Sequence, residues 1–271
     1  MNWLQALVLG AVQGLTEFLP VSSSGHLSLF QTAMNVSGNP LLFDTMLHIG
    51  TLIAVFIFLW KDIVELLKRP FRPLMLYLII ATIPAVIAAL LFGDQIDAAF
   101  KSQAGLPLGI GFIVSAVIMF VTPLFKPGKV DMEKMGIWRP FIMGVAQAVA
   151  ILPSVSRSGA TILSGIATDV RREDVARFSF LMSIPAILGS VVFQAKDVAE
   201  LGAGMATDFS GLLVLLAGVI VAAVTGYLAL RLVIDTIKRG KLWVFGVYTA
   251  VLGAMVIFDS FVTHIVFKTA F

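Results

Sequence analysis

Residues 13–26 have the sequence QGLTEFLPVSSSGH, which interrupts an apolar stretch with one carboxylate, one proline and three consecutive serines. Residues 147–161 have the sequence QAVAILPSVSRSGAT, with the same order of a Gln, a Leu-Pro pair and a Ser-Gly pair. The matching residues of the two stretches are 133 to 134 positions apart, and a further match, Phe43 with Phe178, is 135 positions apart. This offset is close to half of the 271-residue chain. We interpret both stretches as breaks between short helices, one in each half of an internal repeat.

The composition is that of a membrane protein. Apolar residues make up 59% and charged residues 13% of the chain, and the mean hydropathy is +0.99. Soluble domains are roughly 45–50% apolar and 25% charged. So few charges cannot cover a water-exposed surface, which excludes a cytosolic enzyme, a disordered chain and a nucleic-acid binder. Without cysteine there is no disulfide, thiolate metal site or thiol nucleophile. The N-terminus lacks a basic leader and a cleavage site, so we expect no cleavable signal.

Six apolar stretches have the roughly 20 residues that a helix needs to cross a membrane. They cover approximately residues 42–60, 74–92, 105–125, 174–195, 210–232 and 242–267. Four shorter apolar arms cover about 2–19, 26–36, 137–152 and 158–168. The arm from His26 to Val36 would rise only about 16 Å as a helix. We therefore expect the arms to form two hairpins that enter the membrane and turn back.

These elements predict an all-α integral membrane protein with one membrane domain built from two inverted repeats, residues 1–135 and 136–271. Each repeat is expected to contain a re-entrant helix–loop–helix hairpin, at about 2–36 or 137–168, followed by three transmembrane helices that end near residue 125 or 267. Because each copy crosses the membrane three times, an odd number, the second copy starts on the opposite side from the first. The two copies are therefore expected to have opposite orientations. Inverted repeats with broken helices usually place a polar site near the midplane.

The basic residues predict the orientation in the plasma membrane. Fifteen of the 19 Lys and Arg residues lie in connections on one face of the six-span arrangement. The positive-inside rule makes that face cytoplasmic. Both termini and the opening of the first hairpin are then extracytoplasmic, and we expect the active site to face that side of this multi-pass protein.

Glu17 and Gln13 are the first candidates for chemistry. An ionisable group at membrane depth is costly, so it is a functional candidate by default. Gln13 lies four residues before Glu17 and therefore on the same helical face. The alternative is a glutamate that reaches the membrane interface at a helix end.

The run from Ser22 to His26 follows directly. Its hydroxyl and N–H groups precede a short helix, whose N-terminus favours an anion, and a serine near a histidine can form an activated nucleophile. Serine-rich turns and N-caps are also common without such a role. His48 and His264, each a lone histidine near a span, are interpreted as structural.

The second hairpin carries a cation where the first carries an acid. Arg157 is flanked by Ser156, Ser158 and Thr161, and its planar guanidinium suits phosphate oxygens. The alternative is an arginine that reaches lipid headgroups. The first hairpin has a serine in place of Arg157, and the second has apolar residues near Ile151 in place of Glu17. If the two tips meet, the site suits binding and cleavage of a phosphorylated amphiphile.

The two motifs resemble the signatures of the undecaprenyl-pyrophosphate phosphatase family, also called the bacitracin-resistance family, and the resemblance covers essentially the whole chain. It implies an integral membrane phosphatase that removes the terminal phosphate from a C55 isoprenyl diphosphate. The reaction regenerates the lipid carrier for cell-wall glycan synthesis. The resemblance also implies a divalent cation, Mg²⁺ or Ca²⁺, as cofactor.

The resemblance assigns roles by motif position. It implies catalytic roles for Glu17, Ser23, His26 and Arg157, with Glu17 also as a metal ligand. The implied substrate-binding residues are Gln13, Ser22, Ser24, Ser156, Ser158 and Thr161. Gln13 is the neutral option of the family's Glu/Gln-x-x-x-Glu pair, which puts a two-carboxylate metal site in doubt. Ser154 follows Pro153 where the family usually has Gly, so the turn is expected to differ.

Two other functions compete with this one. A transporter or flippase of a polyprenyl phosphate lipid would use the same architecture and Arg157. An intramembrane serine hydrolase would use Ser23 and His26 but would leave Arg157 without a purpose. The expected partners are a polyprenyl diphosphate lipid and membrane lipids, with no nucleic acid. The sequence leaves open a homodimer, and it does not decide whether Ser23 or water is the nucleophile.

Overall fold

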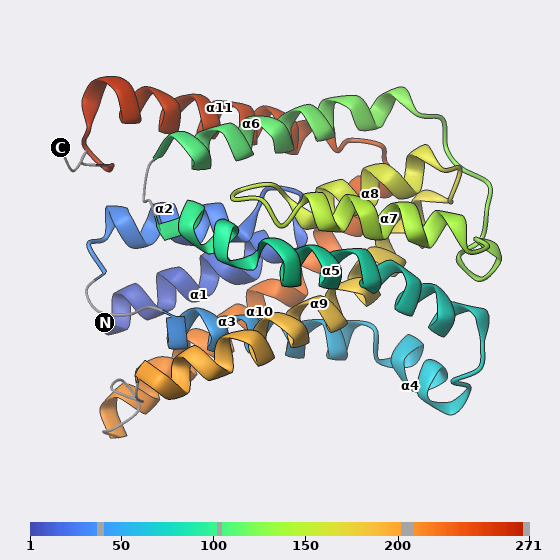
Figure 1. Ribbon diagram of the computed structural model, residues 1–271, viewed down its shortest axis with the longest axis horizontal. Helices are drawn as coiled ribbons and strands as arrows, with labels where there is room; N and C mark the ends of the chain where they lie inside the picture. The colour runs from blue at the N-terminus through green and yellow to red at the C-terminus, as the bar shows by residue number, and fades with distance from the viewer. Residues whose placement is uncertain (37–40, 102–104, 202–208, 268–271) are drawn as a thin grey trace.

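The computed structural model describes residues 1–36, 41–101, 105–201 and 209–267. Within these ranges the chain is almost entirely α-helical (Figure 1), and an isolated bridge between Val130 and Val170 is its one β-type pairing. This confirms the all-α prediction for the described residues.

Six helices are long and apolar enough to cross a membrane, which confirms the number of predicted spans. They are α3 (Leu41–Phe58), α5 (Pro73–Lys101), α6 (Gly105–Val121), α9 (Arg172–Leu201), α10 (Phe209–Lys238) and α11 (Trp243–Phe258). The last α-helix ends before the predicted boundary at residue 267. A π-helical turn, Asp259–Thr263, follows it, and His264 then takes a left-handed φ of 48°.

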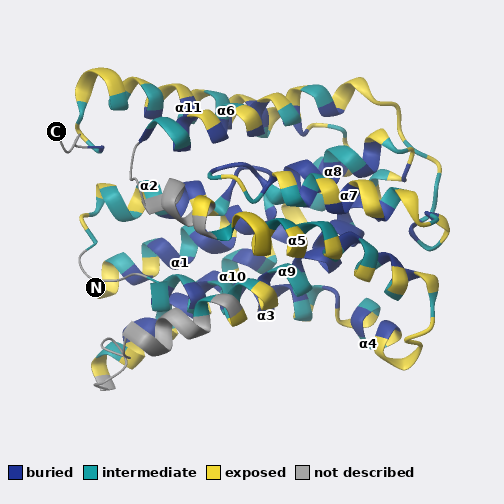
Figure 2. Cartoon of the chain, viewed as in Figure 1, coloured by how far each residue is buried: buried dark blue, intermediate teal, exposed yellow. Residues whose placement is uncertain are grey.

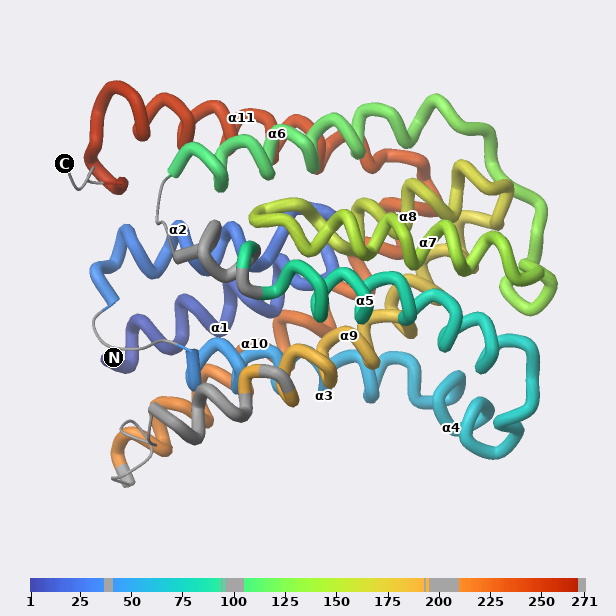
Figure 3. The backbone as a smooth tube through the Cα atoms, in the orientation of Figure 1, coloured from blue at the N-terminus to red at the C-terminus, as the bar shows by residue number. Residues whose placement is uncertain are grey.

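The four short arms form two helical hairpins. The first consists of α1 (Trp3–Phe18) and α2 (Ser23–Ala33), the second of α7 (Trp138–Val149) and α8 (Arg157–Ala167). With 11 residues each, α2 and α8 are only about 16 Å long. Figure 3 shows the first hairpin opening toward the end of the molecule that carries the N-terminus, and the second opening toward the other end. Both connecting loops therefore lie in the middle of the molecule.

Close helix crossings hold the first arm of each hairpin in place. Helix α1 packs against α10, and α7 packs against α5. A Cβ atom added to Gly10 would lie 2.5 Å from the carbonyl oxygen of Gly218, and one added to Gly144 would lie 2.5 Å from that of Ala81. Two equivalent glycines thus let the backbones approach, as small residues do in membrane helix pairs.

The sequence did not predict α4 (Trp60–Lys68), which lies in the first basic connection. It buries Ile63 and Leu66 and leaves Lys61 exposed, and Arg177 of α9 forms an ion pair with Asp62. The long helices instead expose apolar side chains on their outer faces, as Figure 2 shows. A surface of this kind is suited to lipid.

Candidate functional site

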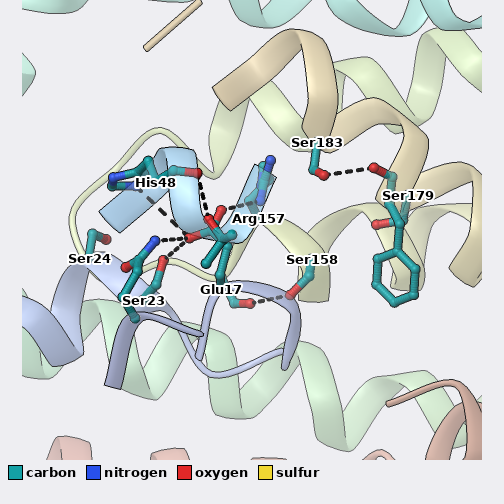
Figure 4. A network of polar contacts seen from close by, with 12 residues as sticks. Glu17, Ser23, Ser24, His48, Arg157, Ser158, Ser179 and Ser183 are labelled. Carbon is teal, nitrogen blue, oxygen red and sulfur yellow. Dashed lines mark hydrogen bonds and ion pairs between the residues drawn. The ribbon is translucent and has the colours of Figure 1, made fainter. Parts of the chain in front are cut away.

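The tips of the two hairpins are bonded to each other where α1 ends and α8 begins (Figure 4). Arg157 Nη2 donates to Glu17 Oε1 over 2.5 Å, and the next residue, Ser158, donates its hydroxyl to the carbonyl oxygen of Leu19 over 3.0 Å. The structure thus brings together the acidic and the cationic tip that the two motifs indicated.

The Glu17 carboxylate accepts two further hydrogen bonds. Ser23 Oγ donates to Oε2 over 2.6 Å, and Gln13 Nε2 donates to the same oxygen over 2.9 Å. Glu17 is only 7% exposed, and burying a charge is costly unless it is paired and hydrogen-bonded. The guanidinium, the hydroxyl and the amide therefore fix the orientation of the Glu17 side chain, with the Ser23 proton directed at it.

The two loops enter their second helices in the same way. Ser22 and Ser156 are the N-caps of α2 and α8 and accept hydrogen bonds from the N–H groups of Gly25 and Gly159, over 3.4 and 3.1 Å. The first N–H groups of an α-helix have no acceptor within that helix, and its N-terminus carries a partial positive charge. The two hairpins therefore offer two helix N-termini suited to an anion.

Ser154 keeps a left-handed backbone in the second loop, with a φ of 58°. Ser115 of α6 fixes this turn, because its hydroxyl donates to the carbonyl oxygen of Ser154 over 3.1 Å and accepts from the N–H of Ser156 over 2.9 Å. A serine in this conformation is strained, whereas a glycine is not. The turn thus has a conformation that a glycine would adopt without strain.

A cavity of about 180 Å³ lies beside the Glu17–Arg157 pair. It is far larger than the roughly 15 Å³ that one water molecule needs. It is lined by Thr16, Glu17, Ser22, Ser23, Ser24, His48, Ala150, Val155, Ser156, Arg157, Ala186, Ile187 and Ser190. Six of the predicted site residues are in this set: Glu17, Ser22, Ser23, Ser24, Ser156 and Arg157. The cavity therefore combines one carboxylate, one guanidinium and several hydroxyls between two helix N-termini.

Three other predicted residues support the lining without being part of it. Gln13 holds Glu17, and Ser158 joins the two loops. Thr161, one turn into α8, shares a hydrogen bond of 2.6 Å with Ser179 of α9 and donates to the carbonyl oxygen of Arg157 over 3.0 Å. Their predicted contact with substrate stays a prediction, while the structure gives them positioning contacts.

The ring of His26 has partners away from the cavity. Its Nδ1 lies 2.7 Å from the carbonyl oxygen of Ser22 and its Nε2 lies 2.7 Å from the hydroxyl of Tyr248. The ring stacks on Tyr248 and contacts the edge of Phe112. Both ring nitrogens are thus engaged, and a role of His26 as acid or base stays a prediction without geometric support here.

His48 of α3, interpreted from the sequence as structural, is the histidine that lines the cavity. Its Nε2 lies 4.0 Å from Glu17 Oε2, and Figure 4 shows its ring beside that carboxylate. One signal was present: Asp44 and His48 are ionisable, lie in an apolar span and are one helical turn apart. The depth criterion that selected Glu17 selects them too.

The predicted metal role of Glu17 does not fit this donor set. Glu17 is the one carboxylate among the residues that line the cavity, and a guanidinium nitrogen lies 2.5 Å from it. No group of three His, Cys, Asp or Glu residues in the described part of the chain is placed to hold an ion. A resident Ca²⁺ site takes about six to eight oxygen ligands, and Mg²⁺ is usually held by one or two carboxylates together with substrate phosphates, so Glu17 alone does not form a resident metal site.

The fold and the cavity define a multi-pass membrane protein with a polar site among its helices. The chain belongs to the family described as bacitracin resistance protein BacA, whose model matches residues 6–255. This confirms the family that the two motifs indicated.

Curated relatives match along nearly their whole length. The chain is 43% identical over 265 residues to undecaprenyl-diphosphatase 4 of Bacillus thuringiensis (strain Al Hakam), covering 98% of this chain and 100% of the relative. It is 40% identical over 257 residues to undecaprenyl-diphosphatase of Carboxydothermus hydrogenoformans, covering 95% and 97%. It is 37% identical over 284 residues to undecaprenyl-diphosphatase of Methanosphaera stadtmanae, covering 97% and 99%.

Proposed function

We propose that this protein is an integral membrane phosphatase that hydrolyses the terminal phosphate of undecaprenyl diphosphate and so recycles the lipid carrier of cell-wall glycan synthesis. The observation that carries the proposal is that one carboxylate, Glu17, contacts both Arg157 and Ser23 at the wall of the cavity. The names of the curated relatives supply the substrate.

The proposed binding mode assigns the diphosphate to Arg157 and the two helix N-termini. The bond to Glu17 is the one hydrogen bond of the Arg157 guanidinium among the described residues, so its other N–H groups are available to phosphate oxygens. Phosphoryl transfer depends mainly on positioning and on stabilising charge on those oxygens. Ser22, Ser24 and Ser156 add hydroxyl donors around the same space.

The proposed nucleophile is Ser23. Its hydroxyl donates to Glu17 Oε2 over 2.6 Å, which leaves the oxygen lone pairs for attack on the terminal phosphorus. Glu17 accepts the proton as the bond from phosphorus to the bridging oxygen breaks. Isoprenyl monophosphate then leaves. We assign the expected Mg²⁺ or Ca²⁺ to the substrate, as the counter-ion of the diphosphate, because Glu17 is already paired with Arg157.

The proposed architecture is two inverted repeats, residues 1–135 and 136–271, each with a re-entrant hairpin. Two sets of equivalent contacts support it. Gly10 and Gly144 occupy matching crossings, and the N-caps Ser22 and Ser156 each bond the glycine three residues later. The homodimer stays a prediction.

We propose that the isoprenyl chain lies in an apolar groove next to the cavity. The groove has a volume of about 530 Å³ and lies between α3, α4, α5 and α9. On α9, Ile184 and Pro185 line the groove, while the next residues, Ala186 and Ile187, line the cavity. A lipid with its diphosphate in the cavity can therefore place its first isoprene units along the groove.

We also propose that phosphate enters and leaves on the extracytoplasmic side. A run of polar side chains leads from the cavity away from the basic end: Ser190 and Gln194 of α9, 3.4 Å apart, and Thr45 of α3, 2.6 Å from Gln194. On the opposite side, Phe18 and Phe180 pack edge to face in the apolar core, with centroids 5.9 Å apart.

The test is phosphate release by the detergent-purified full chain with C55 and shorter isoprenyl diphosphates, with and without a chelator. Hydrolysis without a membrane is expected, since catalysis needs no second compartment. Absence of release with every substrate, together with movement of a labelled polyprenyl phosphate across reconstituted vesicles, would instead establish the flippase.

A further inference from the structure

His48 presents one ring nitrogen to the cavity and anchors the other in its own helix. Nδ1 lies 2.8 Å from the backbone carbonyl oxygen of Asp44. A carbonyl oxygen can only accept a hydrogen bond, so Nδ1 carries the proton. In the neutral ring, Nε2 therefore carries a lone pair, and this atom is the one that lies 4.0 Å from Glu17 Oε2. The backbone of α3 thus fixes the tautomer that a general base requires.

The spacing of these two acceptors suits one water molecule. A separation of 4.0 Å is too long for a direct hydrogen bond between Nε2 and Oε2. A water molecule can donate one hydrogen bond of about 2.8 Å to each of two acceptors when the two acceptor atoms are roughly 4.4 Å apart. The observed separation of 4.0 Å is close to this value. A water on the cavity side of His48 and Glu17 would be oriented in this way while Glu17 is a carboxylate, and once Glu17 carries the Ser23 proton, His48 Nε2 is the acceptor left to that water. Because Ser23 also bonds to Glu17 Oε2, that water lies next to the nucleophile.

The second histidine of the region cannot serve the same purpose. Both nitrogens of the His26 ring are bonded, to Ser22 and to Tyr248, and His26 is not among the residues that line the cavity. Glu17 is also committed once it has taken the proton of Ser23. The reaction of a phosphorylated Ser23 with water therefore needs another proton acceptor in the lining, and among the described residues His48 is the imidazole available.

We propose that His48 is a further catalytic residue, the base that activates water for hydrolysis of a phosphoserine at position 23. This rests on the proposed function. In that step the water oxygen bonds to phosphorus and its proton passes to His48 Nε2. The bond from phosphorus to Ser23 Oγ breaks, and Glu17 returns its proton to Oγ. Inorganic phosphate leaves, and the proton on His48 passes to solvent. Glu17 thus serves the first half of the reaction and His48 the second.

The decisive variant is His48→Asn. An asparagine amide can still donate to the carbonyl oxygen of Asp44, so the structural bond is kept while the Nε2 lone pair is lost. The matched control is His264→Asn, which makes the same change outside the cavity, at a left-handed position that Asn tolerates. Both are purified as full chains, checked for folding by thermal unfolding in detergent, and mixed with C55 diphosphate.

The measurement is the intact mass of acid-quenched protein together with the amounts of the two products. His48→Asn is expected to gain close to one phosphoryl group per chain, to release one equivalent of isoprenyl monophosphate in a burst, and to release phosphate about 10²-fold more slowly than wild type. Added imidazole is expected to restore part of the lost rate. His264→Asn is expected to behave as wild type, and Ser23→Ala to carry no phosphoryl group.

Two results would overturn the assignment of His48. One is phosphate release by His48→Asn at the wild-type rate. The other is slow release with no phosphorylated protein and equal amounts of both products from the first turnover. Hydrolysis by the wild type in either case leaves the proposed function intact, whereas a wild type that releases no phosphate removes the proposed function itself. If His48→Asn does not fold, His48→Gln is measured by the same assay.

Discussion

Glu17 and Arg157 lie 140 residues apart in the chain and form an ion pair of 2.5 Å between the C-terminal end of α1 and the N-terminal end of α8. The side chains are 5% and 20% exposed, so solvent screens the pair only in part. In this structure the Glu17 carboxylate accepts a hydrogen bond from the Arg157 guanidinium, which is the group that we propose binds the phosphate. Glu17 is therefore both the proposed base and a competitor of the substrate for Arg157.

Substitution of Glu17 by Gln is expected to separate these two effects. Turnover should fall by about 10²-fold or more, because the proton acceptor of Ser23 is lost. Binding of a non-hydrolysable methylene diphosphonate analogue should be retained or tightened, because Arg157 loses its competitor. Steady-state phosphate release and calorimetric binding measure the two quantities. Glu65→Gln, at a glutamate paired with Arg72 on the basic end, is the control. A Glu17→Gln enzyme with full turnover would remove Glu17 from the mechanism.

Substitution of Arg157 tests the phosphate clamp. Arg157→Ala should weaken binding of the analogue by roughly 10- to 100-fold, the usual worth of a hydrogen bond to a charged group. Arg157→Lys should recover only part of it, since an ammonium lacks the planar fork. The control is Arg177→Ala, which breaks the ion pair with Asp62 far from the cavity and is expected to change stability rather than affinity. Unchanged affinity in Arg157→Ala would contradict the clamp.

Three glycines test the helix crossings that place the hairpins. Gly10→Ala and Gly144→Ala should each lower stability by about 1–3 kcal/mol, since the added Cβ would meet a carbonyl oxygen at 2.5 Å. Gly189→Ala is the matched control, because a Cβ there has no atom within 4 Å. It should raise stability slightly through helix propensity. Thermal unfolding of the three variants in one detergent gives the comparison, and equal shifts at all three positions would argue against the crossings.

The isoprenyl groove is tested with a bulky side chain. Ile83→Trp fills the groove and should raise the KM for C55 diphosphate by roughly tenfold, as apolar contact with several methylene groups is lost. The KM for a short isoprenyl diphosphate should change much less. Ile110→Trp on α6 is the control, since Ile110 is similarly exposed, at 51% against 48%, but does not line the groove. Equal effects on long and short substrates would place the chain elsewhere.

Hydropathy and motif order were enough to predict the six spans, the four short arms and the contact between the two hairpin tips, but not α4. The six spans follow from apolar length alone, and the short arms follow from the breaks at Pro20 and Pro153. The pairing of the tips follows from a difference in charge, because Glu17 has an apolar counterpart and Arg157 has a serine counterpart. These signals are local or compare one half of the chain with the other, so a sequence contains them directly.

The orientation of the histidines was beyond local sequence. His26 follows three serines and is therefore an attractive base, but its ring bonds to Tyr248, which lies 222 residues further along the chain. His48 has apolar neighbours and no motif, and only the packing of α3 against α9 and α1 brings it to Glu17. Side-chain direction depends on such distant partners, and no periodicity in one sequence encodes them.

The asymmetry of the two tips bears on how such a molecule can originate. Two identical hairpins joined by a two-fold axis would place the same side chain on both tips. Glutamate would then face glutamate, and like charges this close in a poorly screened interior repel each other. A single gene that encodes both tips permits each to change independently. If the two halves are the repeats that we propose, the oppositely charged pair is a property that covalent fusion of duplicated segments allows and that self-association of one segment cannot supply.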